Sequence, residues 1–429
     1  MADSQEVRRT RYLEAVFKGY DGPGIGIRLW DGWRWTCAAA GAPVCTLVVS
    51  HPKALAALAA WPNEVRLGEA FVRGDLDVEG DIFSVFAVVE HLLNRPLTWS
   101  QRLFSRAARG VFAGAEWLRR GAPHSKKRDR ASIEFHYDQP VEFFRPWLGR
   151  TLVYSSAYFH NDCDSLDAAQ EQKLELICQK LRLQPGERFL DIGCGWGGLI
   201  LHAAAHHGVR AEGITLSRSQ AETAERRIAQ AGLAGRCRAD LRDYRDLQHE
   251  GDPFDKIASV GMFEHVGLRN LPLYFRIARG LLRPGGAFLN HAIARNPTAP
   301  VREDSFIARY VFPGGRLVTL NEAIGAAESQ GLEVRDVENL REHYERTLRR
   351  WVEGLRRNET TLLSVVPMTT YRTWLLYLAG SGAAFRRGDI AVYQTLLSRP
   401  ERGLSGLPLT RADWYEPRPA EEPSHASAD

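Results

Sequence analysis

From about residue 150 onward, short apolar runs alternate with longer segments whose apolar positions recur at helical spacing. The short runs are typical of buried strands, and the longer segments are typical of amphipathic helices. Strands and helices that alternate in this order predict a parallel sheet flanked by helices, with right-handed crossovers. The predicted strands are RFLDIG, VRAEGIT, CRAD, KIASV and AFLNHAI, and the predicted helices include SQAETAERRIAQAG and LPLYFRIARGLL.

The pattern divides the whole chain into four predicted regions. Residues 1–100 hold short apolar runs broken by glycine, tryptophan and charge, which favour a small α+β domain. Residues 101–135 form a basic amphipathic linker, and residues 136–400 form the α/β domain. Residues 401–429 form an acidic tail rich in proline, serine and alanine, which we expect to be disordered.

The linker carries the strongest local charge of the chain. Residues 101–130 contain nine basic and two acidic residues, a net charge of +7, with Phe104, Phe112 and Trp117 among them. This mixture is typical of a segment that lies on an anionic membrane surface. An arginine-rich linker with a solvated face explains the pattern equally well, so both interpretations stay open here.

The overall composition narrows the class of protein. The chain has 429 residues, 44% of them hydrophobic and 25% charged, which is typical of a globular protein and ample for a large core. A formal charge of +4 is too small to indicate nucleic-acid binding. Neither a secretory signal nor a membrane-spanning segment is recognisable, so we expect a cytoplasmic protein.

Cysteine and histidine spacing gives no metal motif. The six cysteines include no CxxC pair, which argues against a disulfide framework and against a metal site. His202, His206 and His207 lack the glutamate of the HExxH zinc motif. We interpret these histidines as the surface and flank of one helix.

The strongest local motif is the segment LDIGCGWGG at 190–198, where a predicted strand runs through closely spaced glycines into a helix. Glycine permits the backbone turn and a close approach to a ligand, and the spacing also fits the dinucleotide pattern GxGxxG. Two features favour S-adenosylmethionine as the ligand. Asp191 lies before the first glycine, and the second strand ends at Thr215-Leu216-Ser217 without an acidic residue. The competing hypothesis, that the motif binds a nicotinamide dinucleotide, requires Glu212 to bind the ribose.

Five further positions carry side chains that could bind a ligand or act in catalysis, but none is specific by itself. Asp243 and Tyr244 follow the third strand, where they could hydrogen-bond and stack an adenine. Glu264 follows the fourth strand at the mouth of the sheet, where open α/β folds bind ligands. His291 in LNHAIA is otherwise a typical core histidine, and Tyr344 is unremarkable by itself.

Taken together, the motifs resemble the cyclopropane-fatty-acyl-phospholipid synthases and the related mycolic-acid methyltransferases. The resemblance covers about residues 60–400 and implies a Rossmann-like class I methyltransferase sheet with helices on both faces, preceded by the smaller α+β domain. The segments that carry it are LGEAF at 67–71, HYD at 136–138, YSSAYF at 154–159, LDIGCGWGG at 190–198, GITLSRSQ at 213–220, DYRDL at 243–247, SVGMFEHVG at 259–267, YVFPGG at 310–315, HYERTL at 343–348 and GAAFRRGDI at 382–390.

The resemblance also assigns site residues. Glu264, His291 and Tyr344 correspond to a cage for a bicarbonate ion, with the backbone near Ile293. We add Ser156 to this catalytic set, although the family usually has cysteine there. Serine also replaces the family's later cysteine, at Ser381, which leaves the identity of the product open. The positions expected to hold S-adenosylmethionine are Tyr154, Ser155, Gly193, Gly195, Thr215, Leu216, Gln220 and Tyr244, to which the motif readings add Asp191 and Asp243.

The implied reaction is transfer of a methyl group from the sulfonium to a cis double bond of an unsaturated phospholipid acyl chain. Loss of a proton from the new methyl group closes a cyclopropane ring. Loss of a proton without ring closure gives a methylene- or methyl-branched chain, which is the alternative product. We therefore expect a peripheral association with the inner membrane surface, with bicarbonate as the base. A homodimer and a non-catalytic lipid-binding relative are further possibilities.

Overall fold

The computed structural model describes residues 2–37, 42–52, 54, 64–93, 139–247, 252–299, 305–312 and 317–414. The basic linker, the HYD segment and the tail after residue 414 lie outside the described residues, so the predictions for them are untested. Residues 401–414, which the predicted disordered tail includes, are ordered instead: Trp414 of η6 (Ala412–Trp414) is buried in the core, and Arg182 pairs with Asp413.

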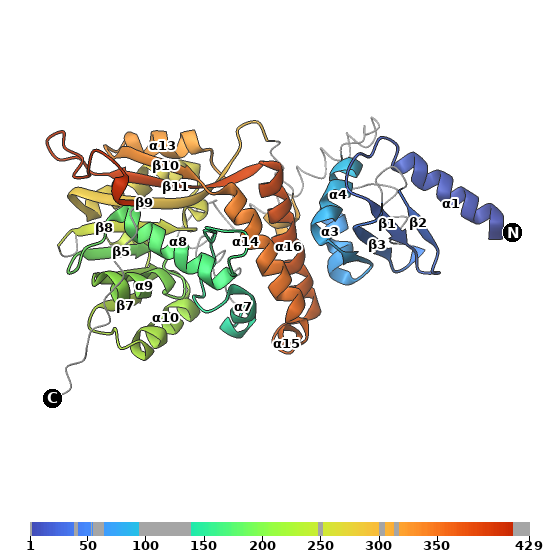
Figure 1. The fold of residues 1–429 in the computed structure, drawn as a ribbon, viewed down its shortest axis with the longest axis horizontal. Helices are drawn as coiled ribbons and strands as arrows, with labels where there is room; N and C mark the ends of the chain where they lie inside the picture. Colours follow the sequence, from blue (N-terminus) through green and yellow to red (C-terminus); the bar gives the residue numbers. More distant parts are fainter. Residues whose placement is uncertain are drawn as a thin grey trace.

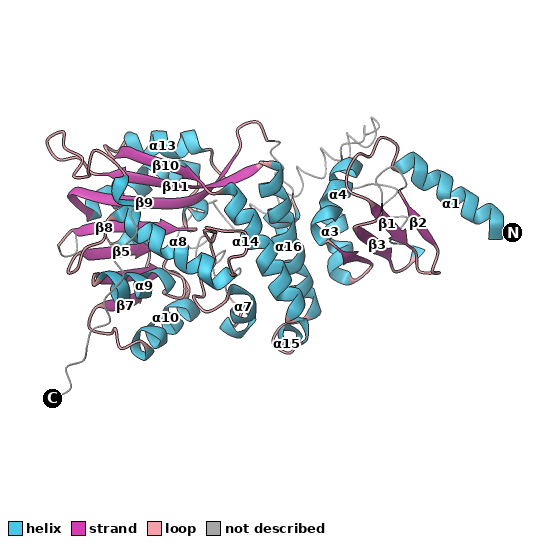
Figure 2. Ribbon diagram, viewed as in Figure 1, coloured by secondary structure: helices cyan, strands magenta, loops and turns pink. Residues whose placement is uncertain are grey.

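A seven-stranded sheet forms the centre of the larger domain, in the order β10-β11-β9-β8-β5-β6-β7 (Figures 1 and 2). β5 to β9 pair in parallel, and β11 is antiparallel to both of its neighbours. The sequence pattern predicts the first five of these strands, whereas β10 and β11 do not follow from it. The strands are β5 (Arg188–Ile192), β6 (Arg210–Thr215), β7 (Cys237–Leu241), β8 (Phe254–Val260), β9 (Leu282–Arg295), β10 (Glu333–Asn339) and β11 (Ile390–Ser398).

Helices cover both faces of this sheet, because successive strand residues point to opposite sides. Phe189 of β5 packs on one side, with helices α8 (Leu166–Leu181), α9 (Gly198–His207) and α10 (Arg218–Gln230). The next residue, Leu190, packs on the other side, with α11 (Leu271–Leu281) and α13 (Leu320–Glu328). This arrangement confirms the predicted α/β class.

The smaller domain has its own four-stranded sheet, in the order β2-β1-β3-β4, and its own apolar core. Helix α3 has an apolar face that carries Val65, Ala70 and Phe71, all buried. The elements are α1 (Ala2–Val16), β1 (Ile25–Arg28), β2 (Arg34–Thr36), β3 (Cys45–Val49), α3 (Glu64–Arg73), β4 (Leu76–Gly80), η2 (Ile82–Ser84) and α4 (Val85–Leu93).

A layer of helices joins the two domains, with α16 facing α3 (Figure 1). Arg372 of α16 crosses the junction: its Nε donates to the Phe71 carbonyl over 2.7 Å, and its guanidinium lies over the Phe71 ring. Phe71, Ile82 and Val85 share one apolar cluster with this layer. The layer consists of α7 (Val141–Leu148), α12 (Phe306–Tyr310), α14 (Arg341–Arg357), α15 (Glu359–Leu363) and α16 (Met368–Arg387).

No helix among the described residues combines the length and apolar character that crossing a membrane requires.

Candidate functional site

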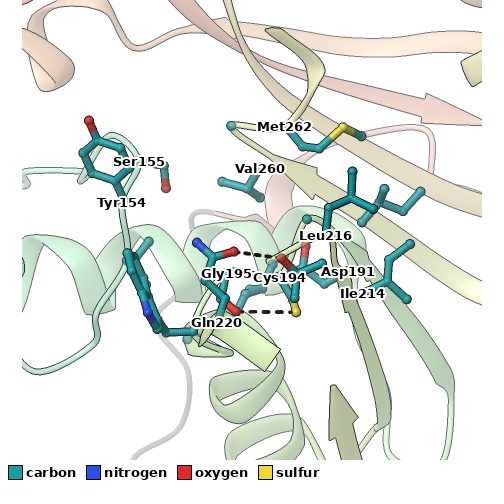
Figure 3. Close-up of a pocket in the computed structure, with 18 of the residues that line it drawn as sticks. Tyr154, Ser155, Asp191, Cys194, Gly195, Ile214, Leu216, Gln220, Val260 and Met262 are labelled. Carbon is teal, nitrogen blue, oxygen red and sulfur yellow. Dashed lines mark hydrogen bonds between the residues drawn. The ribbon is translucent and has the colours of Figure 1, made fainter. Parts of the chain in front are cut away.

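A cavity of about 1070 Å³, counting the part open to solvent, lies at the carboxyl ends of β5, β6 and β8 (Figure 3). This edge is where open parallel sheets bind ligands. The turn after β5 forms its floor, with Gly193 at φ +90° and Gly195 at φ +55°. A Cβ on Gly193 would lie 2.7 Å from the Met262 Cβ, so glycine is required there for both backbone angle and space.

Most of the residues predicted to bind S-adenosylmethionine line this one cavity. They come from four separate parts of the chain and converge as Figure 3 shows. Asp243 does not line the cavity; its carboxylate caps the turn η3 (Tyr244–Asp246) and pairs with Arg245. The predicted residues in the cavity wall are Tyr154, Ser155, Asp191, Gly193, Gly195, Thr215, Leu216, Gln220 and Tyr244.

The end of β6 is organised by polar side chains and not by an acid. Thr215 Oγ1 donates to Gln220 Oε1 over 2.8 Å, and Ser217 caps the start of α10. Glu212 lies outside the cavity wall, where Arg188 and Arg238 bind its two carboxylate oxygens. Burial opposes ionisation of Glu212, but these arginine hydrogen bonds prevail and lower its pKa. Glu212 thus takes part in structural ion pairs. It is not placed to bind a ribose, as the hypothesis of a nicotinamide cofactor requires.

A lysine that sequence analysis missed lies in the cavity wall. Lys173 of α8 is fully buried, and its Nζ donates to Ser155 Oγ over 2.9 Å. Burial lowers the pKa of Lys173 to about 7, and attraction to Asp191 opposes that shift. Burial likewise raises the pKa of Asp191 to about 7, against the influence of Lys173. These two ionisable side chains make the floor of the cavity polar although its surroundings are apolar.

Glu264 and His291 present unsatisfied polar atoms behind the cavity. Glu264 lies in η4 (Phe263–His265), and its Oε1 accepts a 2.7 Å hydrogen bond from the Ile293 amide of β9. His291 lies on β9, opposite Val260 of the cavity wall. Among the described residues, neither Glu264 Oε2 nor His291 Nε2 has a hydrogen-bond partner, although both atoms are buried. Buried polar atoms without partners are rare and indicate a place for a polar ligand.

The protonation of this pair follows from burial. Burial raises the pKa of Glu264 to about 7, with the Ile293 amide acting in the opposite direction. Burial, reinforced by the charges of Lys173 and Lys180, lowers the pKa of His291 well below its usual range, so its ring is neutral. Gln394 Nε2 lies 3.3 Å from His291 Nδ1. A hydrogen bond donated there to Nδ1 leaves the ring proton on Nε2, the unsatisfied atom.

The remaining two predicted catalytic residues have partners of their own. Tyr344 of α14 is buried, and its ring packs 4.6 Å from the Phe385 ring. Ser156 is fully buried, and its hydroxyl donates to the Ala157 carbonyl over 2.9 Å. Neither residue lines the cofactor cavity, so their assignment to the cage stays a prediction.

Tyr377 of α16 joins the two parts of the site, and sequence analysis did not select it. The Tyr154 hydroxyl donates to the Tyr377 hydroxyl over 3.2 Å. Burial raises the pKa of Tyr377 to about 12; a hydrogen bond from Tyr154 opposes the shift and the charge of Glu264 adds to it. Tyr377 is therefore electrostatically coupled to both the cofactor wall and the Glu264 carboxyl. Its position in an apolar helix made it indistinguishable from a core aromatic residue.

Comparison with known proteins gives a consistent assignment. The model of the mycolic acid cyclopropane synthetase family matches residues 124–395. A probable fatty acid methyltransferase of Pseudomonas putida is 39% identical over 396 residues, which cover 91% of this chain and 96% of the relative. The cyclopropane-fatty-acyl-phospholipid synthase of Escherichia coli (strain K12) is 37% identical over 281 residues, covering 65% of this chain and 71% of the relative.

A solved structure agrees with the sequence comparisons. Mycolic acid cyclopropane synthase CmaA1 complexed with SAH and CTAB is 33% identical, with a TM-score of 0.59. The match covers 62% of this chain and 97% of that one. The chain therefore belongs to the mycolic acid cyclopropane synthetase family and is a methyltransferase whose one-carbon donor is S-adenosylmethionine.

Proposed function

We propose that this enzyme transfers the methyl carbon of S-adenosylmethionine to a cis double bond of a phospholipid acyl chain and closes a cyclopropane ring. The observation that carries the proposal is the pair of buried, unsatisfied atoms Glu264 Oε2 and His291 Nε2 beside the cofactor cavity. The names of the Escherichia coli relative and of CmaA1 support cyclopropane formation on lipid acyl chains.

The first bond change is a positioning problem. The alkene carbon attacks the sulfonium methyl, the S–CH₃ bond breaks, and S-adenosylhomocysteine leaves as the neutral thioether. A positive charge remains on the acyl chain. The rings of Tyr154 and Tyr377, next to the cavity, are suited to stabilise that cation through their faces.

The second change is loss of one proton from the transferred methyl carbon, which closes the ring. The donor and acceptor set fits a bicarbonate ion, because His291 Nε2 offers a proton and Glu264 Oε2 accepts one. When bound, bicarbonate would supply the base for this step. Glu264 and His291 orient it, and the apolar surroundings of the site exclude water from the cation.

Nuclear magnetic resonance of the product tests this proposal. The purified protein is incubated with S-adenosylmethionine and vesicles of cis-unsaturated phospholipid, and the acyl chains are released for analysis. Cyclopropane and methylene products gain the same CH₂ unit, so mass alone does not separate them. Cyclopropane protons resonate at unusually high field and identify the ring. Vinylic methylene protons or a branch methyl signal would contradict ring closure.

A methyl- or methylene-branched product is the second candidate. The observation that favours it is the Pseudomonas putida relative, which is called a probable fatty acid methyltransferase and matches 91% of this chain. Ser156 and Ser381, which stand where the resemblance expects cysteine, are consistent with a changed proton-removal step. The same spectrum decides between the two candidates.

We also propose that the enzyme works at a membrane surface, since its substrate chains reside there. The +7 charge of residues 101–130 supports attraction to anionic lipid, at about 1 kcal/mol per basic residue near the surface. Activity on vesicles should fall when salt is added or when anionic lipid is omitted. Activity unchanged by both treatments would contradict electrostatic docking. Self-association of the enzyme stays a prediction.

A further inference from the structure

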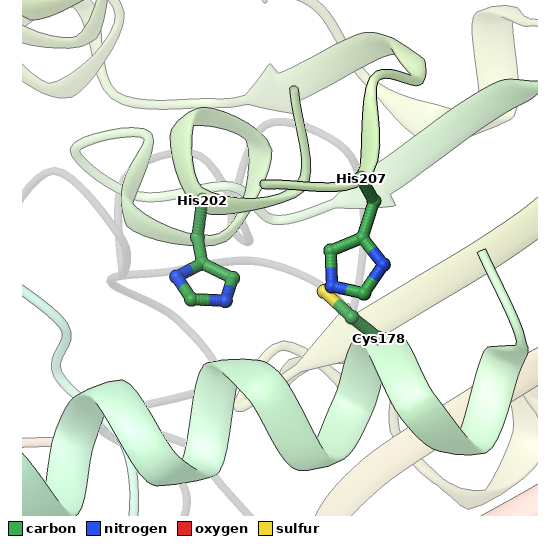
Figure 4. A group of neighbouring side chains, drawn as sticks. All are labelled: Cys178, His202 and His207. Atoms are coloured by element: carbon green, nitrogen blue, oxygen red, sulfur yellow. The ribbon is translucent and has the colours of Figure 1, made fainter. Parts of the chain in front are cut away.

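A second cluster of reactive side chains lies between α8 and α9, within the apolar core and apart from the reacting groups. The sulfur of Cys178 and one ring nitrogen each of His202 and His207 all lie within 4.8 Å of one another. Cys178 and His207 are buried, and His202 is partly exposed. Figure 4 shows both imidazole rings reaching from α9 toward α8, with the Cys178 sulfur beside the His207 ring.

The fold assembles this cluster from residues that no single sequence motif connects. On α8, Glu175 and Cys178 are three residues apart and therefore share one helix face. On α9, His207 is the last helical residue before Gly208, whose φ of +64° ends the helix. The interpretation of these histidines as surface and flank is wrong for His207, which is only 5% exposed.

Glu175 ties the two histidines together. Its Oε2 lies 3.1 Å from Nε2 of His202 and 3.1 Å from Nε2 of His207. Adjacent nitrogen and oxygen ligands of a tetrahedral zinc ion, with bonds near 2.0–2.1 Å, lie about 3.3 Å apart. The spacing of the nitrogens around the carboxylate oxygen is thus close to that of a ligand shell. The Cys178 thiol beside the His207 ring adds a sulfur donor of the kind that zinc sites use.

We propose that Cys178, His202 and His207 bind one divalent transition-metal ion of the zinc class, with Glu175, which contacts both histidines, beside the ion. A thiolate and two neutral imidazoles form a donor set suited to Zn²⁺ and unsuited to Mg²⁺ or Ca²⁺. Binding requires the Cys178 thiol to lose its proton, which passes to solvent.

The bound ion would connect two helices that also build the cofactor cavity. Leu174 and Ile177 of α8 and Leu199 of α9 line that cavity, and they lie close in sequence to Cys178 and His202. The metal therefore acts as a structural clamp behind the cavity wall, since none of Cys178, His202 and His207 lines the cavity itself. It takes no part in the methyl transfer, so this proposal is independent of the product that the enzyme makes.

Cobalt spectroscopy on the full-length protein tests the site directly. Protein freed of metal with a chelator is titrated with Co²⁺ and, separately, with Zn²⁺ against a chromophoric competitor. We expect one equivalent of either ion per chain, a sulfur-to-cobalt charge-transfer band, and about one proton released per Zn²⁺ bound. Zinc should also raise the thermal unfolding midpoint of the metal-free protein.

Matched variants separate this site from adventitious binding. Cys178→Ser and His207→Gln should each weaken zinc binding at least about tenfold, and Cys178→Ser should abolish the charge-transfer band. The controls are Cys163→Ser, which removes an exposed thiol, and His206→Gln, which removes the neighbouring histidine. Both controls should bind as the unmodified protein does.

Binding of S-adenosylhomocysteine verifies that each variant is folded. If a variant is not folded, His202→Gln, which changes a partly exposed residue, takes its place. Absence of stoichiometric binding to the unmodified protein would overturn the proposal. Equal binding by Cys178→Ser, His207→Gln and the controls would overturn it as well.

Discussion

Two buried carboxyl groups face the same catalytic region but are treated differently by the fold. Asp191 has a buried cation, Lys173, among its neighbours, and Lys173 in turn binds the Ser155 hydroxyl. The Oδ1 atom of Asp191 is nevertheless buried without a hydrogen-bond partner among the described residues. Glu264 has only the Ile293 amide on one oxygen, and its second oxygen has no hydrogen-bond partner among the described residues. Burial raises the pKa of both carboxyls to about 7.

The difference shows which of the two carboxyl groups has its charge offset by the protein before a ligand binds. Each carboxyl keeps one buried oxygen without a hydrogen-bond partner among the described residues, but only Asp191 has a cation nearby that offsets its charge. The Glu264 and His291 pair therefore depends more on a polar ligand than the cofactor floor does. Removing a residue from the cofactor floor around Asp191 and Lys173 should lower both the stability of the protein and its affinity for the cofactor. Removing Glu264 or His291 should lower turnover while leaving the fold intact.

The largest expected effect is on turnover in Glu264→Gln. The amide keeps the shape of the side chain but replaces the accepting oxygen's charge in a water-poor site, where such groups contribute most. We expect kcat to fall by about a thousandfold and the dissociation constant of S-adenosylmethionine to stay within about twofold. Product assays and calorimetric titration measure the two quantities.

Glu353→Gln is the matched control for this prediction, because Glu353 is an exposed carboxylate of α14 with an ordinary helical ion pair to Arg350. It should retain full activity. Normal turnover in Glu264→Gln would remove Glu264 from the catalytic group and with it the contrast between the two carboxyls.

The next effect is on stability and cofactor binding in Lys173→Met. The variant leaves Asp191 buried without its neighbouring cation and Ser155 without its donor. Removing one partner of a buried charge pair costs about 3 kcal/mol in the free energy of unfolding. We also expect S-adenosylmethionine to bind about tenfold more weakly, because the cavity floor loses its arrangement. Denaturant titration and calorimetry provide the measurements.

Lys180→Met offers a control on the same helix. Lys180 is also buried, but its ammonium pairs with Glu338 and not with the cofactor wall. The control should lose stability and keep its affinity for S-adenosylmethionine. Equal loss of affinity in both variants would show that Lys173 acts through helix α8 as a whole.

The comparison also shows how far sequence could reach. Gly193, Gly195 and Asp191 were predictable because one strand, one turn and one helix start form a local motif. Lys173 was missed because a helical lysine is ordinarily solvated, and nothing in its neighbours shows that α8 is buried there. Gln394, which orients His291, comes from β11, a strand that sequence analysis missed and that pairs with β9 across about a hundred residues.

A smaller effect concerns stability against pH, and it isolates Glu264 from Asp191. The folded-state pKa of Glu264 is about 7, above the ordinary value of 4.5, so the folded protein holds this proton more tightly. Its stabilising contribution is complete below pH 4.5 and is lost as the pH rises through 7. The glutamine side chain in Glu264→Gln does not titrate. Asp191 titrates in both proteins, so its contribution cancels in the difference between their free energies of unfolding.

At pH 8 we therefore expect Glu264→Gln to be more stable than the unmodified protein by about 2 kcal/mol, and near pH 4.5 by less than about 0.5 kcal/mol. Denaturant unfolding at the two pH values measures both differences. A difference that does not change with pH would mean that Glu264 is not held in a strongly desolvated site.

The smallest effect tests whether Ser156 belongs to the unsatisfied site at all. Its hydroxyl donates to the Ala157 carbonyl, which is a satisfied, local arrangement. Ser156→Cys restores the residue that the family resemblance expects and exchanges a good hydrogen-bond donor for a weak one in a fully buried position. If the hydroxyl serves only Ala157, kcat changes by no more than about threefold, the value of one neutral hydrogen bond, and the product ratio stays constant. A larger loss of kcat, or a shift between cyclopropane and branched product, would instead place Ser156 beside Glu264 in catalysis. We expect the smaller change, because a serine with its own backbone partner has no unsatisfied atom to offer a ligand.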